Sequence, residues 1–266
     1  MPDEARHIWA EDMSTAYDEL LVPAVFRPWA TDLATRAAAH GPQDVLELAA
    51  GTGVLTRALA VALPAARTTA TDLNDAMVDV GRTKAPAATW RQADAMQLPF
   101  DDDSADLVAC QFGVMFFPDR PAAYREVARV LRPGGRFLFT TWAALATHEV
   151  EAEVMAALAA VFPDDPPSFL ARVPHGYHEV DRVAADLAMA GFRDLDVETV
   201  ERECRAPSVD DLARGYCRGT PLRAEIEARG DLETCTGQVA AALRTRWGTG
   251  PVLARMSAHI VTASLG

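Results

Sequence analysis

The stretch DVLELAAGTG, residues 44–53, joins a run of mainly apolar residues to a glycine turn. Such a run is typical of a strand buried in a sheet, and Gly51 and Gly53 let the chain turn tightly where a ligand could touch the backbone. A helix expected over 53–63 would present free N–H groups at its start. The run also carries Glu47, a carboxylate that a buried strand does not need. The stretch therefore suggests a ligand site at the end of a strand.

Strands and helices alternate beyond this turn. We expect strands over 43–49, 67–72, 89–94, 104–112, 135–142, 192–201 and 252–264, and helices over 53–63, 74–84, 119–131, 148–161 and 180–190. Asn74 and Asp119 are expected to cap the helices that follow them. The alternation predicts an α/β fold with a doubly wound, mostly parallel, Rossmann-like sheet of seven strands.

The segments around this sheet have helical patterns. Residues 1–40 form a predicted N-terminal helical arm, whose pattern over 9–39 is interrupted near Pro23 and Pro28. Residues 41–266 form the main domain, with helical insertions at about 143–178 and 203–250. We expect the arm and both insertions to act as a lid or cap over the cleft at the strand ends.

The charge of the chain limits the partners that it can have. Lys and Arg number 25 and Asp and Glu 38, so the formal net charge is −13. We expect no nucleic-acid partner and no integral membrane contact, because nucleic acid and anionic membranes repel an acidic chain and no apolar run is long enough to span a bilayer. The N-terminus does not resemble a signal peptide, so a cytoplasmic location is expected. The cysteines lack the spacing of a zinc knuckle or redox pair, and we expect no metal site.

Further polar residues stand where strands two, three and four end. Ligands of a doubly wound sheet bind beyond the carboxyl ends of its strands. Asp72 follows the glycines by about 20 residues and could accept both ribose hydroxyls of an adenosine, and Asp94 could accept from an adenine amino group. Leu73, Met77, Ala95, Met96, Gln111 and Phe112 are expected beside them. Taken singly, Asp72 could instead be a helix cap and Asp94 a turn residue.

The glycine turn differs from a dinucleotide-binding fingerprint. The third glycine of G-x-G-x-x-G is replaced by Thr56. Glu47 would also place negative charge near a pyrophosphate, whereas a ligand with an ammonium or sulfonium group would suit it better. A nicotinamide-dependent oxidoreductase is therefore a less favoured alternative.

Four motifs together resemble a known family. VLELAAGTG (45–53), TATDLNDAMV (69–78), ADAMQLPFDDDSADLVACQFGVMFFPD (93–119) and VLRPGGRF (130–137) resemble, in order, the motifs of class I S-adenosylmethionine-dependent methyltransferases. In particular they resemble the group that includes the ubiquinone/menaquinone-biosynthesis-like small-molecule enzymes. The resemblance covers roughly residues 40–142.

This resemblance implies S-adenosyl-L-methionine as cofactor and in-line methyl transfer to a small organic acceptor. It implies contacts to the methionine part from Gly51 and Gly53, to the ribose from Asp72, to the adenine from Asp94 and Ala95, and near the methionine amino group from Gln111. The full expected set is Glu47, Ala49, Gly51, Thr52, Gly53, Asp72, Leu73, Met77, Asp94, Ala95, Met96, Gln111 and Phe112. Ala49 departs from the family, which usually has glycine or another very small residue there. A non-catalytic cofactor-binding protein of the same fold is the other alternative.

The acceptor and its atom cannot be read from the motifs. An activated methyl group needs mainly alignment, and a general base only if the acceptor must lose a proton. The sequence carries no catalytic signature, but Tyr17 and His148 are candidates for such a base. Residues expected near the acceptor are Tyr17, Phe116, His148, His175, Tyr177 and Tyr216. Each of them could instead be a packing residue, and the oligomeric state stays open.

Overall fold

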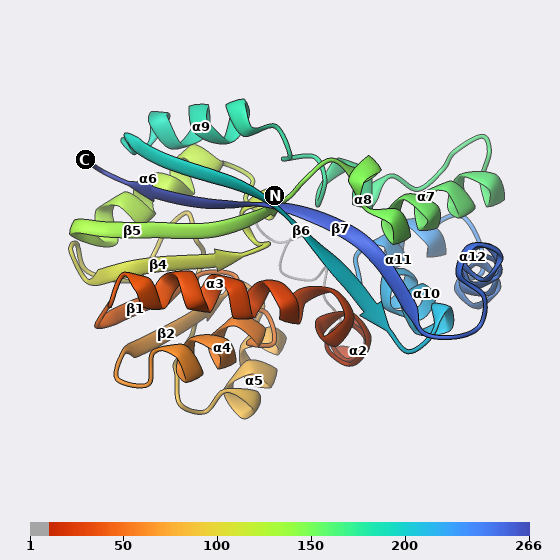
Figure 1. Ribbon diagram of the computed structural model, residues 1–266, viewed down its shortest axis with the longest axis horizontal. Coiled ribbons are helices and arrows are strands. Elements are labelled where there is room, and N and C mark those ends of the chain that lie inside the picture. Colours follow the sequence, from red (N-terminus) through yellow and green to blue (C-terminus); the bar gives the residue numbers. More distant parts are fainter. Residues whose placement is uncertain (1–10) are drawn as a thin grey trace. The chain divides into compact units, whose positions relative to one another are not determined.

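The computed structural model describes residues 11–266. It contains a seven-stranded sheet with the order β3-β2-β1-β4-β5-β7-β6 (Figure 1). The strands are β1 (Asp44–Glu47), β2 (Arg67–Asp72), β3 (Thr89–Gln92), β4 (Ala105–Gln111), β5 (Leu131–Trp142), β6 (Asp194–Ala206) and β7 (Val252–Ser264). Neighbouring strands from β3 to β5 pair in parallel, whereas β7 pairs with β5 in the antiparallel direction. The predicted fold class is confirmed.

The strand order decides where a ligand can bind. The chain runs outward from β1 to β3 and then returns to place β4 on the other side of β1. Glu47, the last residue of β1, is in register with Ala70 of β2 and Ala109 of β4. The carboxyl end of β1 therefore lies at the point where the strand order reverses, which is where open α/β sheets bind ligands.

The chain divides into two compact units, which we describe separately. The unit that contains most of the sheet comprises Pro28–Ala143, Tyr177–Val200 and Ala258–Gly266, and we call it the sheet unit. Its helices are α3 (Arg27–Ala39), α4 (Val54–Ala62), α5 (Asp75–Lys84), α6 (Arg120–Val130), α9 (Val180–Met189) and the short 3-10 helix η2 (Val114–Phe116). Helices α3, α4 and α5 cover one face of the sheet, and α6 and α9 cover the other (Figure 1).

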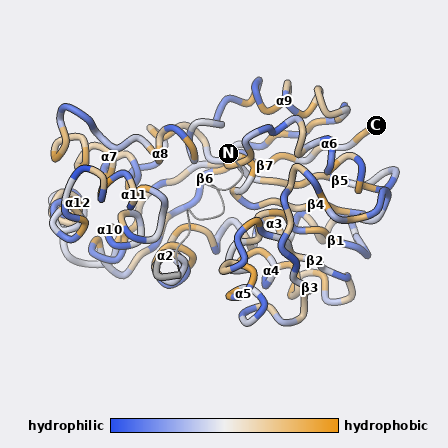
Figure 2. The backbone as a smooth tube through the Cα atoms, turned by 180° about the vertical axis from the view of Figure 1, so that it is seen from behind, coloured by the Kyte–Doolittle hydropathy of each residue, from blue (hydrophilic) through white to orange (hydrophobic). Residues whose placement is uncertain are grey.

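The core of the sheet unit follows from the apolar strands. Leu107 and Val108 of β4 and Phe137 and Phe139 of β5 are fully buried, and both strands lie mostly in the hydrophobic colours of Figure 2. Such runs are expected where helices cover both faces of a parallel sheet. Asn74 and Asp119 cap α5 and α6, because their side chains accept backbone N–H groups of the first helical turn.

The second unit is mainly helical, and we call it the helical unit. It comprises the described residues up to Arg27, Ala144–Gly176 and Glu201–Ser257. Its helices are α2 (Glu11–Ala16), η1 (Tyr17–Phe26), η3 (Leu145–Thr147), α7 (Glu149–Val161), α8 (Phe169–Arg172), α10 (Val209–Arg218), α11 (Leu222–Glu227) and α12 (Leu232–Trp247). Helix α10 contacts α12, α11 and η1. Close packing there depends on Gly215, since a Cβ atom at this position would lie 2.7 Å from the Leu21 side chain.

Two local predictions were wrong. The helix over 9–39, of which residues 9 and 10 lie outside the described residues, is interrupted neither at Pro23 nor at Pro28. The chain instead widens into the π-helix η1, where the Arg27 N–H bonds to Val22 O, five residues back. This wider turn accommodates a proline that an α-helix would exclude. Strand β5 begins at Leu131 rather than 135, with a register irregularity against β4 near its start.

Within residues 11–266, no helix combines the length and the apolar character that crossing a membrane requires.

Candidate functional site

The glycine turn between β1 and α4 has an unusual backbone. Ala49, Gly51 and Gly53 all have positive φ, at 50°, 55° and 84°, so this turn lies largely in the region that glycine favours. A Cβ atom on Gly51 would meet no atom of the described residues within 4 Å, whereas one on Gly53 would lie 3.0 Å from the Trp90 ring. Gly51 therefore leaves space beside the backbone, while Gly53 makes room for packing. Between them the Thr52 hydroxyl is buried and has no hydrogen-bond partner among residues 11–266.

Ala49 fits this turn because its neighbour is small. A Cβ atom at Gly113, which follows β4, would lie 2.5 Å from the Ala49 Cβ and 2.6 Å from the Cys110 Sγ. The methyl group of Ala49 thus lies in the space that a side chain at Gly113 would need. The alanine at position 49 therefore fits because Gly113 has no side chain, although the left-handed backbone conformation is unfavourable for alanine.

Glu47 is held inside the protein at the end of β1. Only 1% of the residue is exposed, and the Thr56 hydroxyl of α4 donates to its Oε2 at 2.7 Å. Burial raises the pKa of Glu47 to about 8, and Asp72 adds to the rise while Thr56 opposes it. In this structure Glu47 is therefore mainly neutral at pH 7, so it would complement a cation only by losing its proton. Thr56, which replaces the third glycine of the dinucleotide fingerprint, thus serves as the hydrogen-bond donor to Glu47.

Asp72 ties the end of β2 to the glycine turn. Its Oδ2 accepts the Gly51 N–H and its Oδ1 the Asn74 N–H, each at 2.9 Å. The helix cap of α5 is Asn74, whose Oδ1 accepts the Ala76 N–H at 2.9 Å, so Asp72 is not needed in that role. Burial raises the pKa of Asp72, although the N–H groups of Asn74 and Gly51 oppose the rise. The carboxylate is therefore oriented by the turn predicted to bind the ligand.

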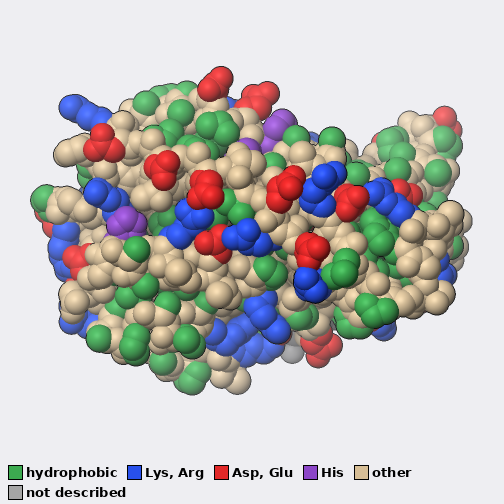
Figure 3. Space-filling view, viewed as in Figure 1, with side chains coloured by type: hydrophobic (Ala, Val, Ile, Leu, Met, Phe, Trp, Pro, Cys, Tyr) green, Lys and Arg blue, Asp and Glu red, His purple; other side chains and the backbone are tan. Residues whose placement is uncertain are grey.

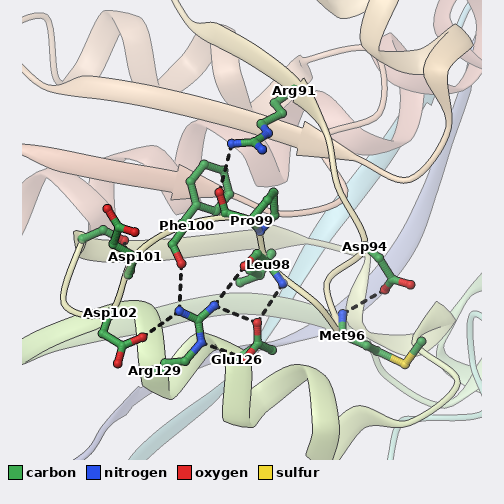
Figure 4. Close-up of polar contacts among 11 residues, drawn as sticks. Arg91, Asp94, Met96, Leu98, Pro99, Phe100, Asp101, Asp102, Glu126 and Arg129 are labelled. Carbon is green, nitrogen blue, oxygen red and sulfur yellow. Dashed lines mark hydrogen bonds and ion pairs between the residues drawn. The ribbon is translucent and has the colours of Figure 1, made fainter.

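Asp94 forms a local turn after β3. Its Oδ1 accepts the Met96 N–H at 2.9 Å (Figure 4), and its backbone carbonyl accepts the Gln97 N–H at 3.0 Å. Asp94, Ala95 and Met96 are all half-buried. The alternative that Asp94 is a turn residue therefore describes its present contacts, and a ligand role would use its second oxygen.

Arg129 of α6 holds the loop that follows this turn. Its guanidinium donates to the carbonyl oxygens of Leu98 and Phe100 and to the Asp102 carboxylate, at 2.8–2.9 Å (Figure 4). The same group pairs with Glu126, which in turn accepts the Leu98 N–H at 2.8 Å. The loop after Asp94 is thus fixed to α6 by the side chains of Arg129 and Glu126.

The remaining predicted cofactor residues also belong to the sheet unit, where Leu73 follows β2, Met77 lies in α5, and Gln111 and Phe112 lie at the end of β4. Leu73 and Gln111 are half-buried and Met77 is buried. Phe112 has a φ of 53°, and its ring stacks on Trp142 with centroids 3.5 Å apart and meets the edge of Trp29 at 5.8 Å. The two tryptophans were missed, although a tryptophan at the end of β5 is a visible signal in the sequence.

The residues predicted near the acceptor fall into both units. In the sheet unit, Tyr177 is buried, donates to Asp186 Oδ2 at 2.9 Å and lies under the Arg120 guanidinium. Phe116 of η2 is 43% exposed. In the helical unit, Tyr17 is half-buried, and its ring centroid lies 5.0 Å from that of Phe26.

Three of the predicted residues meet in the helical unit around a fourth that was missed. His148 Nδ1 lies 2.8 Å from Glu151 Oε2, and the His148 and His175 ring centroids are 4.4 Å apart. The Tyr216 side chain also hydrogen-bonds Glu151. Burial alone would raise the pKa of Glu151, but the positive charge of His148 outweighs it and holds the value at about 2. Glu151 could have been found from its place one helical turn after His148.

Residues 46–139 match the protein family described as Methyltransferase domain. The ubiquinone/menaquinone biosynthesis C-methyltransferase UbiE of Paracoccus denitrificans is 36% identical over 135 residues, which are 47% of this chain and 54% of that protein. The demethylmenaquinone methyltransferase of Deinococcus radiodurans is 36% identical over 125 residues, which are 46% of this chain and 52% of that protein. The chain spans about half the length of the curated relatives it matches. The resemblance to methyltransferases is thus confirmed for the part of the chain that carries the glycine turn.

Solved structures agree with the fold. The YcgJ protein of Bacillus subtilis superposes with a TM-score of 0.57 over 89% of this chain and 97% of its own, at 22% identity. The phosphoethanolamine N-methyltransferase 2 of Haemonchus contortus, solved with S-adenosylhomocysteine, gives a TM-score of 0.62 over 98% of this chain and 59% of its own, at 16% identity. At these identities the likeness shows the fold alone.

Proposed function

We propose that this protein transfers the methyl group of S-adenosyl-L-methionine to a small organic acceptor. The observation that carries the proposal is the bond from the Gly51 N–H to the Asp72 carboxylate. It joins two of the predicted cofactor residues at the point where the strand order reverses. The match of residues 46–139 to the Methyltransferase domain family supports the same conclusion.

The residues of the turn are suited to this cofactor. The Asp72 oxygens accept the Gly51 and Asn74 N–H groups, and a bond from the Leu73 N–H also lowers the pKa of this carboxyl group. A carboxylate has about four acceptor positions, so capacity remains for a ribose hydroxyl. Gly51 has free space beside it, which would let the methionine part approach the backbone. Asp94, Ala95 and Met96 would contact the adenine, and Gln111 would lie near the methionine amino group.

Glu47 would respond to a positively charged ligand. A nearby sulfonium or ammonium group favours the ionised form of a carboxyl group and lowers its pKa. The raised pKa of Glu47, about 8, would fall on binding, and a proton would leave at neutral pH. Thr56 would keep donating to the carboxylate that results.

The chemistry requires alignment more than acid or base catalysis. S-adenosylmethionine supplies a methyl group already activated by its sulfonium. The protein would hold the acceptor in line with the bond that breaks and would keep water out of the site. Any proton lost by the acceptor would need a base, for which Tyr17 remains a candidate from the sequence.

The acceptor that we propose is a small organic molecule, without a more specific identity. The names of the curated relatives refer to ubiquinone and menaquinone, but each match covers about half of this chain and does not extend the likeness to the whole of either protein. We keep as predictions that the arm 1–40 and the insertions 143–178 and 203–250 select the acceptor and that the protein is cytoplasmic.

A nucleic-acid partner is not expected on grounds of charge. The net charge is −13, and acidic and basic side chains lie next to one another on the face shown in Figure 3. Within the sheet unit, Arg36 pairs with Glu198 at 2.7 Å and Arg132 with Asp106 at 2.7 Å. Paired arginines are less available for phosphate contacts than an unpaired basic stripe would be.

Calorimetric titration with S-adenosylmethionine and its demethylated product tests the cofactor. We expect both to bind, and Asp72→Ala to weaken binding at least about 100-fold because the ribose hydroxyls lose a charged acceptor. Asp75→Ala, an exposed acid in the first turn of α5, is the control and should bind as the unaltered protein does. Binding of NADH with no binding of the methyl donor would favour the oxidoreductase alternative.

The acceptor is found by incubating the protein with a methyl-labelled donor and a metabolite extract. Mass spectrometry should then show a small molecule that gains one labelled methyl group, and the Asp72→Ala variant should not produce it. Cofactor binding without transfer to any component of the extract would support the non-catalytic alternative.

A further inference from the structure

The buried group around Glu151 has the composition of a metal site. His148 is the residue before the first turn of α7, Glu151 lies in that turn, and His175 follows α8. All three belong to the helical unit. Their exposed fractions are 0%, 6% and 2%. Glu151 forms its ion pair with His148, inside this group, so the carboxylate charge is balanced locally.

The distances suit a small cation. One ligand atom from each of His148, Glu151 and His175 can be chosen so that all lie within 4.8 Å of one another. Bonds of about 2.0–2.1 Å to a tetrahedral Zn²⁺ would keep such atoms about 3.3 Å apart. Small rotations of the side chains would therefore bring the three atoms onto one ion.

The orientation of His148 indicates which nitrogen would bind. Its Nε2 lies 2.6 Å from the backbone carbonyl of Ser257, so Nε2 carries the proton that the carbonyl accepts. Metal-binding histidines are commonly oriented by such a bond from their other ring nitrogen. The Nδ1 atom then faces Glu151 Oε2 at 2.8 Å. Two electron pairs at this distance repel unless a proton or a metal ion lies between them.

The surroundings of Glu151 also suit a ligand. Tyr216 hydrogen-bonds its carboxylate and orients it from outside the three-residue group. A carboxylate and neutral imidazoles are the forms that bind metal, so a metal ion would displace any proton held between His148 Nδ1 and Glu151 Oε2.

We propose that His148, Glu151 and His175 bind a divalent transition-metal ion. Two imidazoles and one carboxylate are a ligand set that Zn²⁺ accepts, with one of its four positions left for another ligand. The metal replaces the proton on His148 Nδ1 and joins α7 to the segment after α8. The sequence did not indicate the site because His175 is distant from Glu151 along the chain, and the absence of C-x-x-C spacing pointed away from metal.

Metal content tests this site without reference to methyl transfer. The full chain is stripped with a chelator, supplied with Zn²⁺, freed of excess ion and measured by plasma mass spectrometry. We expect one equivalent per chain, and a fall of at least about tenfold in retained metal for both His175→Ala and Glu151→Gln, since each removes one of three ligands. His40→Gln, which removes an exposed histidine of the sheet unit, should retain one equivalent.

A cobalt spectrum of the unaltered protein tests the site without any variant that could misfold. Co²⁺ added to the stripped unaltered protein should give the visible absorption of a cobalt ion with nitrogen and oxygen ligands, and Zn²⁺ should abolish it by competition. No cobalt spectrum together with no retained zinc in the unaltered protein would overturn the proposal, and a proton would then lie between His148 and Glu151. Retention of a full equivalent by folded His175→Ala would overturn it as well.

Discussion

The glycine turn of the sheet unit and the buried His148–Glu151 group of the helical unit are built in different ways. The turn owes its form to backbone conformation within residues 47–53 and to one carboxylate from the next strand. The buried group owes its form to side chains from α7, from the segment after α8 and from α10, and to a carbonyl of β7. The first is encoded locally and should tolerate changes elsewhere, whereas the second depends on how distant segments pack.

The largest effect is expected from breaking the buried group. Glu151→Ala would leave His148 buried without its carboxylate, and removing one partner of a buried ion pair costs about 3–5 kcal/mol. Urea unfolding followed by circular dichroism would measure the loss. Glu153→Ala, two residues along the same helix and 3.7 Å from partly exposed Arg246, should cost less than about 1 kcal/mol. Equal losses of unfolding free energy for both variants would show that the buried group stabilises the protein no more than an exposed ion pair does.

The turn should show a pH dependence that depends on Glu47. The folded-state pKa of Glu47, about 8, lies above the ordinary 4.5, so the folded protein holds a proton that the unfolded chain releases between these values. The stabilisation of the fold by this proton is present in full below pH 4.5 and is lost as the pH rises to 8. We expect about 2–4 kcal/mol over this range. Thermal unfolding of Glu47→Gln at several pH values should show a flatter profile, and an unchanged profile would assign the dependence to another group.

The contact between Ala49 and Gly113 gives a test of steric fit. Gly113→Ala would bring its Cβ to 2.5 Å from that of Ala49, and overpacking of this kind costs about 1–3 kcal/mol. The free energy of unfolding measures the effect. Gly237→Ala is the control, because Gly237 lies within α12 and a Cβ atom there meets nothing within 4 Å among the described residues. It should be neutral or stabilising by up to about 1 kcal/mol, and a loss as large as that of Gly113→Ala would refute the steric explanation.

The smallest effect is expected at Ala49 itself. Its φ of 50° is unfavourable for alanine, and Ala49→Gly should stabilise the protein by about 0.5–1 kcal/mol. Ala50→Gly should have the opposite sign, since Ala50 is buried and lacks a positive φ. Differential scanning calorimetry on the two variants would compare neighbouring alanines. Destabilisation by both would mean that the methyl of Ala49 contributes more through packing than it costs through conformation.

The same contrast explains what could be predicted from the sequence. Strands β2 and β7 were predicted with their observed bounds, and Asn74 and Asp119 were identified as caps, because periodicity and capping are local properties. Gly51 and Asp72 were both expected at the carboxyl ends of parallel strands, but the hydrogen bond between them was not predicted. The partner of Glu47 was not predicted, since Thr56 had only been compared with a fingerprint it does not satisfy.

The sequence was a weaker guide where contacts are distant. His148, His175 and Tyr216 were each named as possible acceptor residues, but nothing in their spacing predicted that they would surround Glu151. Tyr177 is close to His175 along the chain, yet it belongs to the sheet unit and is held by Asp186. Pro23 was read as a helix break because α-helical geometry was assumed, and the wider π-helix removes that requirement.

The place of β7 has a consequence for how the chain is made. In the sheet, β7 lies between β5 and β6, although it is synthesised after both. When the nascent chain has emerged only as far as β6, β6 cannot join the sheet, because its neighbour β7 has not yet left the ribosome. During this interval the edge of β5 is open to pairing with other chains. Synthesis halted before Val252 should therefore yield a product that aggregates or is retained by chaperones.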